Sequence, residues 1–415
     1  MRLIPAAATA LLALLLCACA TPRHAPPPAT PARVPVLLVS LDGFHPRHLG
    51  QGRTPTLDAL AAGGARAQWM TPSYPSLTFP NHYTLVTGLR PDRHGIVHNT
   101  MRDPALGQFK LSDRDAVGDG RWWGGEPLWV TAERAGLPTA TLSWPGSEAE
   151  IGGVRPTRWH LFDDARPVDD RIDTVLGWLR EPPATRPRFA TLYFEHLDHA
   201  AHAHGPDSQE ALEAVQRLDA ALGRLVDGLR AGGALDAVNI VVTSDHGMAT
   251  VAPGQVVVVE DMVEEADARL VTTGQSVGFT PLPGRTAQAE AQLLGRHDHY
   301  ACWRKGELPA RWHYGRHPRV PAIVCQMDEG WDAIRRDWVE SRPSHDRGLH
   351  GYDPALPSMR ALFIAHGPAF RPGTVLPPIE NVDVYPLLAR LLGVPPAPND
   401  GDAQALLPAL RATSP

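Results

Sequence analysis

Basic residues are few in this sequence and do not form a cluster. The chain of 415 residues has 39 Lys and Arg against 45 Asp and Glu, which gives a formal net charge of −6 at pH 7. A protein that holds the phosphate backbone of nucleic acid needs a concentrated positive surface. We therefore expect no nucleic-acid-binding surface on this protein.

Cysteine is also scarce. Of the four cysteines, Cys302 and Cys325 lie beyond the first 33 residues, and neither belongs to a Cys-x-x-Cys pair. This spacing excludes a cysteine-bound structural zinc site of the common type. In an exported protein the two could form a disulfide, or they could be two small buried side chains that never meet.

No apolar run is long enough to span a bilayer comfortably. Residues 3–18 follow a single Arg2 and predict a signal peptide over residues 1–18. Cys19 follows small residues as in a bacterial lipobox, although Ala18-Cys19-Ala20 also fits ordinary cleavage. Residues 19–33 are rich in Pro and Ala and should form an extended tether. We expect an exported, periplasmic lipoprotein, anchored to a bacterial membrane through Cys19.

Four apolar runs rich in β-branched residues predict buried strands, at residues 35–41, 189–197, 239–244 and 360–366. Continuous apolar runs suit strands that are covered on both faces. Helical patterns lie between them, most clearly at 54–64, with a Thr cap and a Gly stop, and at 208–233. The alternation predicts an α/β fold, an α/β/α sandwich with a mainly parallel central sheet.

The stretch from about 254 to 340 breaks this alternation. It has a run of valines and a segment rich in His and Trp, with few clear helices. We interpret it as a small inserted subdomain of short strands and loops, within a single domain that covers residues 34–410.

Polar side chains follow the predicted strands at the point where each strand ends. Asp42 follows the first strand, Asp198 the second, and the pair Asp245–His246 the third. In open α/β sheets, ligands bind beyond the carboxyl ends of the strands. We therefore expect these residues to lie together at one edge of the sheet.

Two sets of metal ligands can be drawn from these motifs. Asp198 and His202 are four residues apart, so one helical turn could direct both at one ion. His350 would complete a three-ligand set of the kind found in catalytic zinc sites. Asp42 and the pair Asp245–His246 would form a second set. Because two cations can stabilise both the attacking and the leaving oxygen of a phosphoryl displacement, we expect two metal ions per chain.

Thr78 lies where a nucleophile would be needed. Pro80 and Gly88 predict a short helix with Thr78 near its N-terminus, where free N–H groups would favour an alkoxide and an incoming phosphate. A Thr hydroxyl is a poor nucleophile at neutral pH, but a divalent cation stabilises its alkoxide. Taken alone, Thr78 could equally be a helix cap.

The other histidines have a simpler interpretation. Those beside the motifs should pack against the ligands or support them: His82, His94, His98, His196, His199, His204 and His366. Four more lie between residues 254 and 340 and could form a third metal site, although packing is the simpler expectation: His297, His299, His313 and His317.

These motifs resemble those of the nucleotide pyrophosphatase/phosphodiesterase family, within the alkaline phosphatase superfamily. The matching words, in one order from Val36 to the C-terminal region, include LDGFHPRHL, PSLTFPNHYTLVTG, WPGSEAEI, HLDHAAHAHGP, SDHGM and HGYDP. The resemblance implies an alkaline phosphatase-like fold with two zinc ions and Thr78 as the nucleophile. One zinc ion would activate Thr78 and be held by Asp42, Asp245 and His246. The other would activate the water of the second step and be held by Asp198, His202 and His350.

The resemblance also implies substrate-binding residues. Asn99 would hydrogen-bond a non-bridging phosphoryl oxygen, and a neutral amide suits a diester; taken alone, Asn99 would be a turn residue. Phe79 and Tyr193 match positions that sandwich a nucleobase. A second Tyr expected after WPGS is not clear, and Trp159 and Phe162 are the candidates in that neighbourhood.

On this resemblance we expect a phosphodiesterase that hydrolyses nucleotide phosphodiester or pyrophosphate bonds through a covalent threonine intermediate and releases nucleoside 5′-monophosphate. One alternative is a lysophospholipase C-like or phosphomonoester hydrolase of the same superfamily. Another is a surface lipoprotein that keeps the fold but only binds a partner. The residue types do not identify the metal, because Asp/His sites also accept manganese, iron or cobalt.

Overall fold

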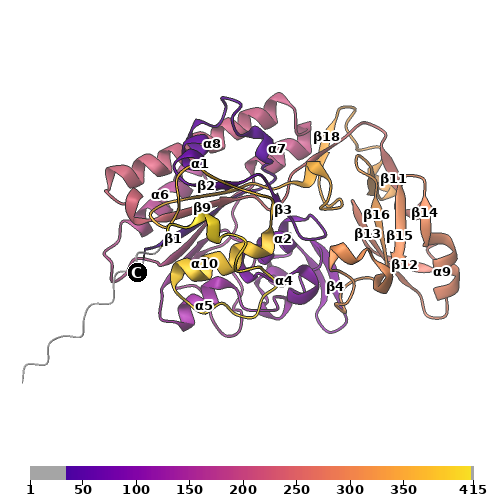
Figure 1. Ribbon diagram of the computed structural model, residues 1–415. Helices are drawn as coiled ribbons and strands as arrows, with labels where there is room; N and C mark the ends of the chain where they lie inside the picture. Colours follow the sequence, from indigo (N-terminus) through magenta and orange to yellow (C-terminus); the bar gives the residue numbers. More distant parts are fainter. Residues whose placement is uncertain (1–33, 413–415) are drawn as a thin grey trace, which may run out of the picture. The chain divides into compact units, whose positions relative to one another are not determined.

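The computed structural model describes residues 34–412, and an eight-stranded sheet is its largest element (Figure 1). The strand order is β20-β2-β19-β9-β1-β8-β6-β7. The strands from β9 to β7 run parallel, and β19 runs antiparallel to its neighbours β9 and β2. The bounds are β1 (Val36–Leu41), β2 (Ala65–Ala67), β6 (Thr139–Leu142), β7 (Arg158–His160), β8 (Phe189–Phe194), β9 (Asn239–Thr243), β19 (Phe363–His366) and β20 (Thr374–Leu376). The predicted α/β fold with a mainly parallel central sheet is confirmed.

Strand β1 lies in the middle of this sheet and is buried along its whole length. Its side chains alternate between two hydrophobic clusters, Val36 and Leu38 on one face and Leu37, Val39 and Leu41 on the other. Because both faces of the strand are covered, the sequence of β1 is continuously apolar instead of alternating.

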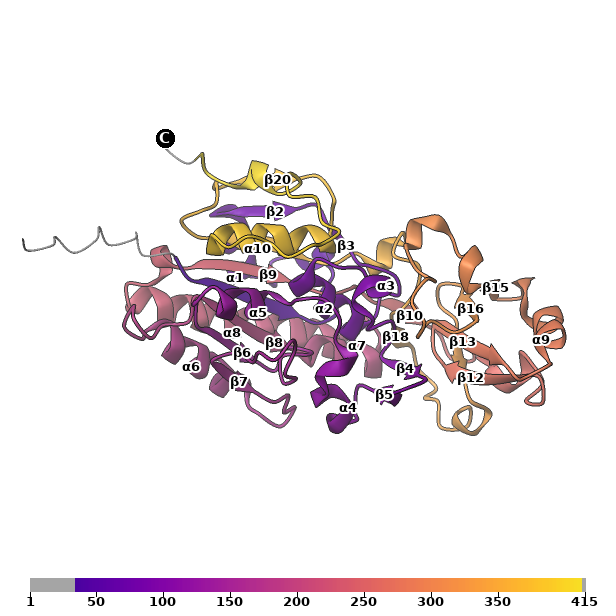
Figure 2. The same cartoon turned by 90° about the horizontal axis from the view of Figure 1, so that it is seen from below.

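Helices cover both faces of the central sheet (Figure 1). One set consists of α1 (Pro55–Ala62), α6 (Val168–Leu179), α7 (His196–His204) and α8 (Gln209–Ala231). The other consists of α2 (Thr78–Thr87), α5 (Leu128–Arg134) and α10 (Val384–Leu392), which Figure 2 brings to the front. None of the helices between residues 34 and 412 combines the length and apolar character that a bilayer-crossing segment requires.

Helix α1 begins where the sequence predicts, but its cap differs from the expectation. Thr54 occupies the N-cap position, yet its hydroxyl donates to the carbonyl of His48 (3.2 Å) and does not cap the helix. The carboxylate of Asp219 in α8 instead accepts the N–H groups of Thr56 and Leu57, at 3.0 and 2.8 Å. A residue distant in sequence therefore caps α1 and ties it to α8.

A second, five-stranded sheet forms within residues 254–340. Its order is β12-β13-β16-β15-β14, and all its pairs are antiparallel. The bounds are β12 (Ala268–Thr272), β13 (Ser276–Pro281), β14 (Gly295–His297), β15 (Tyr300–Arg304) and β16 (Ile323–Met327), with α9 (Thr286–Leu293) between β13 and β14. Cys302 and Cys325 lie opposite each other on β15 and β16 and form a disulfide. Of the two arrangements that the sequence leaves open for these cysteines, the structure has the disulfide.

Two short strand pairs flank the five-stranded sheet in sequence. β11 (Val256–Val258) pairs with β17 (Asp332–Ile334), and β10 (Ala249–Val251) pairs antiparallel with β18 (Arg347–Leu349). The last pair matters for the site, because it brings the residue after β18 back beside the end of β9.

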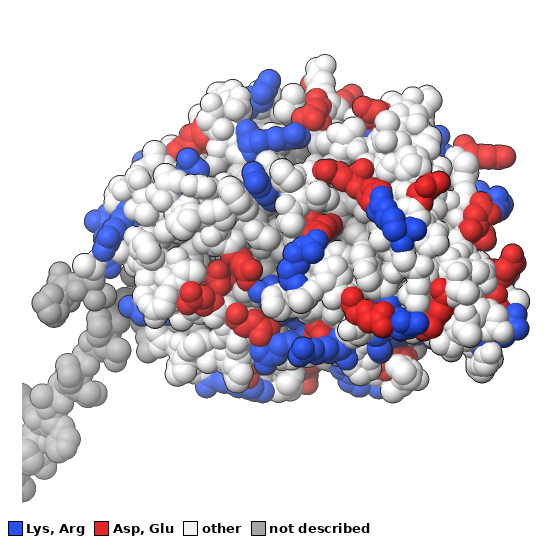
Figure 3. All heavy atoms as spheres, turned by 45° about the vertical axis from the view of Figure 1, so that its right-hand side comes forward, with Lys and Arg blue, Asp and Glu red and all other residues white. Residues whose placement is uncertain are grey.

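The remaining strands and α-helices are short. They are β3 (Met70–Thr71), β4 (Thr100–Asp103), β5 (Gly107–Lys110), β21 (Ile379–Glu380), α3 (Pro91–His94) and α4 (Arg114–Gly118). On the face drawn in Figure 3, positive and negative side chains are intermixed. The predicted signal peptide (1–18), the tether (19–33) and Cys19 lie outside the described residues.

Candidate metal centre and active site

The central strands place three carboxylates at one edge of the sheet. Asp42 directly follows β1, Asp245 lies two residues after β9, and Asp198 is in the first turn of α7, just beyond β8. Because β8 and β9 flank β1 on either side, the three strand ends meet. His350 joins them by another route, because it directly follows β18.

Two glycines permit the close approach of these segments. Gly43 adopts a positive φ of 71°, and its N–H donates to Asp245 Oδ1 at 3.2 Å. At Gly247 an added Cβ would lie 2.2 Å from the carbonyl oxygen of Ser358. The Asp-Gly and Asp-His-Gly motifs therefore have a steric reason as well as a chemical one.

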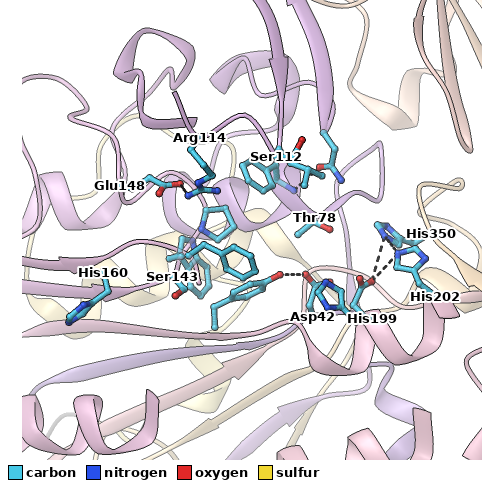
Figure 4. Close-up of a pocket in the computed structure, with 18 residues that line it drawn as sticks. Asp42, Thr78, Ser112, Arg114, Ser143, Glu148, His160, His199, His202 and His350 are labelled. Carbon is cyan, nitrogen blue, oxygen red and sulfur yellow. Dashed lines mark hydrogen bonds and ion pairs between the residues drawn. The ribbon is translucent and has the colours of Figure 1, made fainter. Parts of the chain in front are cut away.

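Asp198, His202 and His350 converge on one point. Figure 4 shows the two histidines of this set side by side. The two Nε2 atoms are 3.1 Å apart and lie 3.4 and 3.6 Å from Asp198 Oδ1. Each ring turns its other nitrogen to a backbone carbonyl, His202 Nδ1 to Gly348 (2.7 Å) and His350 Nδ1 to Ser76 (2.9 Å). A carbonyl oxygen only accepts, so in both rings Nδ1 carries the hydrogen.

This arrangement fits a cation. With hydrogen on Nδ1, the Nε2 atoms of His202 and His350 face each other and are the ring atoms left to bind an ion. Burial, with the charges of His246 and His202, holds the pKa of His350 well below its ordinary value, so this ring is neutral. Asp198 Oδ1 is buried and accepts no hydrogen bond from the described residues. Three electron-pair donors without a shared proton suit a divalent metal ion.

A second set of donors surrounds His246. Its Nε2 lies 2.9 Å from Asp245 Oδ2 and 3.5 Å from Asp42 Oδ1, and its Nδ1 lies 2.9 Å from the carbonyl of Gly247. Asp42 Oδ2 accepts a hydrogen bond of 2.6 Å from the Tyr193 hydroxyl, whereas Asp42 Oδ1 is buried and accepts none from the described residues. One oxygen of Asp42 is thus held and the other is free for a metal.

The pKa shifts of the residues in this second set also favour a bound cation. Burial, with the charges of Asp245 and Asp198, raises the pKa of Asp42 well above its ordinary value. Burial alone would also raise the pKa of Asp245, but the facing His246 and His82 outweigh it and lower that pKa. Burial would lower the pKa of His246, but Asp245 outweighs it and raises that pKa. Carboxylates this close together are stabilised by a cation between them.

The two sets overlap in space. The ligand atoms of Asp198 lie within 4.8 Å of those of Asp42 and His246, so Asp198 borders both sets. The ligand atoms of His82 also lie within 4.8 Å of those of Asp42 and Asp245. However, His82 Nδ1 lies 2.9 Å from the carbonyl of Thr78, and His82 Nε2 lies 2.8 Å from the Ser40 hydroxyl. With both nitrogens engaged, His82 supports the site and does not bind a metal. Within residues 34–412 no group of three potential ligands includes His297, His299, His313 or His317.

Thr78 is the first residue of α2 and lies beside the second set. Its hydroxyl oxygen is 3.4 Å from His246 Nε2. The next residue, Phe79, donates its N–H to Asn99 Oδ1 at 3.0 Å. This bond fixes the amide orientation of Asn99, because only its oxygen can accept, and leaves its NH₂ group available to a ligand.

A cavity of about 340 Å³ opens over Thr78 (Figure 4). It is lined by Asp42, Thr78, Phe79, Asn99, Leu111, Ser112, Arg114, Ser143, Trp144, Pro145, Glu148, His160, Phe162, Tyr193, Asp198, His199, His202 and His350. The rings of Phe162 and Tyr193 lie 6.0 Å apart on one wall. Phe79, Asn99, Phe162 and Tyr193 thus line the same cavity as Thr78.

Trp159 does not line this cavity, and that expectation is corrected. It belongs to β7, an edge strand of the central sheet, where successive side chains point to opposite faces. His160 and Phe162 face the cavity, whereas Trp159 is 37% exposed and lies under the guanidinium of Arg155, 4.9 Å from its ring centre. It lines an adjoining open depression on the surface.

The far end of the cavity has polar residues that the sequence did not reveal. Arg114 forms an ion pair with Glu148, and Ser112 lines the wall beside it. Glu148 follows the WPGS motif, so its neighbourhood carried a signal. Ser112 lies in the turn between β5 and α4, and Arg114 is the first residue of α4; no local pattern there indicates a site.

A buried ion pair holds one wall of the cavity in place. Arg171 of α6 is fully buried and donates to both carboxylate oxygens of Glu195, at 2.6 and 2.8 Å. It also donates to the carbonyls of Tyr193 and Asp163, both at 3.0 Å. Arg171 therefore links the end of β8 to the loop after Phe162. Loss of either charge would leave the other buried and unpaired.

Comparison with known proteins places the chain in a family. A family model described as type I phosphodiesterase / nucleotide pyrophosphatase matches residues 36–353. The rat ectonucleotide pyrophosphatase/phosphodiesterase family member 3 is 35% identical over 95% of this chain, which spans about half (46%) of that relative. A fission yeast (Schizosaccharomyces pombe) protein, an uncharacterised pyrophosphatase/phosphodiesterase, is 36% identical over 91% of this chain and 80% of its own length.

Solved structures agree with this relationship. Murine ectonucleotide pyrophosphatase/phosphodiesterase 5, as an inactive threonine-to-alanine variant in complex with AMP, matches with a TM-score of 0.85 and 31% identity over 91% of this chain and 100% of that chain. The human protein of the same name matches with a TM-score of 0.86 and the same identity and coverage. The chain belongs to the type I phosphodiesterase / nucleotide pyrophosphatase family.

Proposed function

We propose that this protein is a metal-dependent hydrolase that cleaves nucleotide phosphodiester or pyrophosphate bonds and releases nucleoside 5′-monophosphate. The observation that carries the proposal is the position of Thr78. Its hydroxyl lies 3.4 Å from His246 Nε2, at a helix N-terminus and on the wall of a cavity with aromatic sides.

We propose two zinc ions as the cofactors. Asp42, Asp245 and His246 would hold one, and Asp198, His202 and His350 the other. When bound, such ions lower the pKa of a coordinated hydroxyl or water and stabilise charge on a phosphoryl group. Asp42 Oδ1 and Asp198 Oδ1 are buried and have no hydrogen-bond partner within residues 34–412, which supports this assignment.

Thr78 is the proposed nucleophile. Its hydroxyl loses its proton to solvent, its oxygen forms a bond to phosphorus, and the bond from phosphorus to the leaving oxygen breaks. The leaving oxygen takes a proton from solvent where it needs one. Water then attacks phosphorus, the bond from phosphorus to the Thr78 oxygen breaks, and a proton from that water returns to Thr78. The N–H groups at the start of α2 favour the negative charge that passes through the phosphoryl oxygens.

Asn99 and the aromatic walls would hold the substrate. The NH₂ group of Asn99 donates to a phosphoryl oxygen, and a neutral donor suits a diester with a single negative charge. The rings of Phe79, Phe162 and Tyr193 provide faces for a nucleobase, and stacking tolerates different bases. The AMP that the murine relative's structure contains supports a nucleotide as the ligand, and its inactive threonine variant supports a threonine nucleophile.

The test combines a nucleophile variant with a substrate panel. Thr78→Ala should lower kcat by about 10⁴-fold or more, as loss of a nucleophile does in other covalent hydrolases. Thr87→Ala, at the other end of α2, should keep the wild-type rate. Brief reaction of the wild type, stopped in acid, should leave a nucleotidyl group on the peptide that contains Thr78. Turnover by Thr78→Ala at the wild-type rate would refute the nucleophile.

The substrate panel addresses the alternatives. A nitrophenyl ester of a nucleoside 5′-monophosphate should react with a higher kcat/KM than nitrophenyl phosphate or a choline lysophospholipid. Preference for either of the last two would replace the proposed substrate by a phosphomonoester or a lysophospholipid. No turnover of any of them by the zinc-loaded protein would favour a binding role.

We also propose that residues 34–410 form a single catalytic domain with an insertion at about 254–340, and that the protein is exported and anchored through Cys19. The disulfide Cys302–Cys325 supports export, because disulfides persist in oxidising compartments. Expression in a bacterium with radiolabelled palmitate tests the anchor. The wild type should incorporate label and the Cys19→Ala variant should not; an unlabelled wild type would contradict the anchor.

A further inference from the structure

We infer that the Tyr193 hydroxyl is a positioning group for the metal centre: it holds Asp42 so that only one carboxylate oxygen is presented to the metal. The inference rests on the metal-dependent function proposed above. It assigns to Tyr193 a role distinct from that of an aromatic wall.

The geometry of the contact is specific. Tyr193 lies near the end of β8 and Asp42 follows the end of the neighbouring strand β1, with Ser40 and Tyr193 paired in register. The Tyr193 hydroxyl donates to Asp42 Oδ2 at 2.6 Å, within the short range of hydrogen bonds to carboxylates. Both side chains are buried.

The two oxygens of Asp42 are therefore different. Oδ2 is engaged by the phenol, whereas Oδ1 accepts no hydrogen bond from the described residues and lies 3.5 Å from His246 Nε2. Without the hydroxyl, the carboxylate could rotate about its last bond and point either oxygen at the metal, or both. The Tyr193 hydroxyl removes that freedom before the metal binds.

The ring of Tyr193 is itself held in place. It makes an edge-to-face contact with His82 (4.9 Å between centres, 89°) and a tilted contact with Phe162 (6.0 Å). In its contact with Asp42 the Tyr193 hydroxyl is the donor, because a carboxylate oxygen accepts. The hydroxyl is thus a fixed donor on a fixed ring.

This arrangement has a consequence for substrate recognition. The one polar atom of the Tyr193 side chain is committed to Asp42, so a ligand in the cavity meets Tyr193 through its ring alone. Loss of the hydroxyl should therefore change metal binding and leave substrate binding intact.

The experiment compares three variants. Tyr193→Phe removes the hydroxyl and keeps the ring, Phe162→Leu removes a neighbouring wall ring, and Tyr83→Phe removes the hydroxyl of another buried tyrosine, one without a hydrogen-bond partner among the described residues. Zinc is titrated into each metal-free protein against a chromophoric chelator. The same proteins at saturating zinc are assayed for KM and kcat, and their thermal unfolding is recorded.

We expect Tyr193→Phe to bind one of two zinc ions about 10- to 100-fold more weakly, the usual effect of losing a group that orients a metal ligand. The affinity for the other zinc ion and the KM at saturating zinc should stay within about twofold of the wild-type values, because Asp42 belongs to only one of the two ligand sets. Phe162→Leu should raise KM and keep both zinc affinities. Tyr83→Phe should match the wild type in all three measurements.

Unchanged zinc affinities in Tyr193→Phe overturn the inference. Equal weakening of both ions, with a lower melting temperature than Tyr83→Phe, also overturns it, because that pattern indicates general loosening of the fold. The titration does not depend on turnover, so it still decides the inference if the proposed reaction proves wrong.

Discussion

Replacement of Asp42 by Asn separates two effects of the crowded carboxylates: their mutual repulsion in the metal-free protein and their contribution to metal binding. Asp42 and Asp198 are 1% and 7% exposed, and their oxygens lie within 4.8 Å of each other. Two unit charges at that separation repel by about 3 kcal/mol at an effective dielectric constant of 20. The metal-free protein carries this repulsion, and the metal-bound protein converts it into binding energy.

Whether Asp42→Asn stabilises or destabilises the fold should depend on whether zinc is bound. In Asp42→Asn the amide oxygen still accepts from Tyr193, and the new NH₂ group can donate to a neighbouring carboxylate. We expect the metal-free variant to be more stable than metal-free wild type by about 1–3 kcal/mol. With saturating zinc the order should reverse, because each tenfold loss of metal affinity removes about 1.4 kcal/mol of ligand stabilisation.

The difference should also depend on pH. Burial and the neighbouring charges raise the pKa of Asp42 in the folded state above its unfolded value, which is about 3.9 for Asp. A raised folded-state pKa contributes stability that is fully present below the unfolded pKa and is lost as pH rises through the folded pKa. The advantage of the metal-free variant should therefore be small below pH ~4 and grow as pH rises.

Urea unfolding followed by circular dichroism, with chelator or with zinc, measures both effects. Asp219→Asn is a matched control, because Asp219 is also buried but accepts two N–H groups at the start of α1. It should lower stability with or without zinc. If Asp42→Asn is less stable than wild type in chelator at pH 7, the repulsion argument is wrong.

Three further predictions concern the cavity and the second sheet. Asn99→Ala should lower kcat/KM for a nucleotide diester by about 10- to 100-fold, because a hydrogen bond to a charged oxygen contributes about 1.5–3 kcal/mol; wild-type kinetics would contradict the assigned role. Phe162→Ala should raise KM several-fold whereas Trp159→Ala should not, and steady-state kinetics would expose the opposite order. Replacement of both Cys302 and Cys325 by Ser should lower unfolding free energy by about 3 kcal/mol, because the bridge joins residues 23 positions apart, and leave kcat unchanged. Equal denaturation midpoints would show that the bridge does not stabilise the fold.

The sequence predicts the central part of the fold well, for physical reasons. The runs that contain β1, β8 and β9 are buried on both faces, so their composition alone marks them as strands. A parallel sheet brings together the residues at the carboxyl ends of such strands, and for this reason Asp42 and Asp245 are found from pattern. The short helix that starts at Thr78 is marked by Pro80 and Gly88.

The misses concern residues whose position depends on tertiary structure. Trp159 and Phe162 are both aromatic and three positions apart on and after an edge strand, so composition does not tell which of them faces the cavity. Arg114 begins α4, a helix of five residues that is too short to show periodicity, and it meets Glu148 at the cavity. The capping of α1 by Asp219 joins two segments far apart in sequence, which no local rule anticipates.

The two proposed sets of ligands are completed at different points along the chain. A growing polypeptide has Asp42, Asp245 and His246 by residue 246, but the set that includes Asp198 and His202 waits for His350. The whole five-stranded sheet is synthesised in between, and His350 directly follows β18, the strand that pairs with β10. The two halves of the centre thus become complete at different times during synthesis. A chain that ends before β18 would contain only one complete set, Asp42, Asp245 and His246, at the carboxyl ends of the parallel strands.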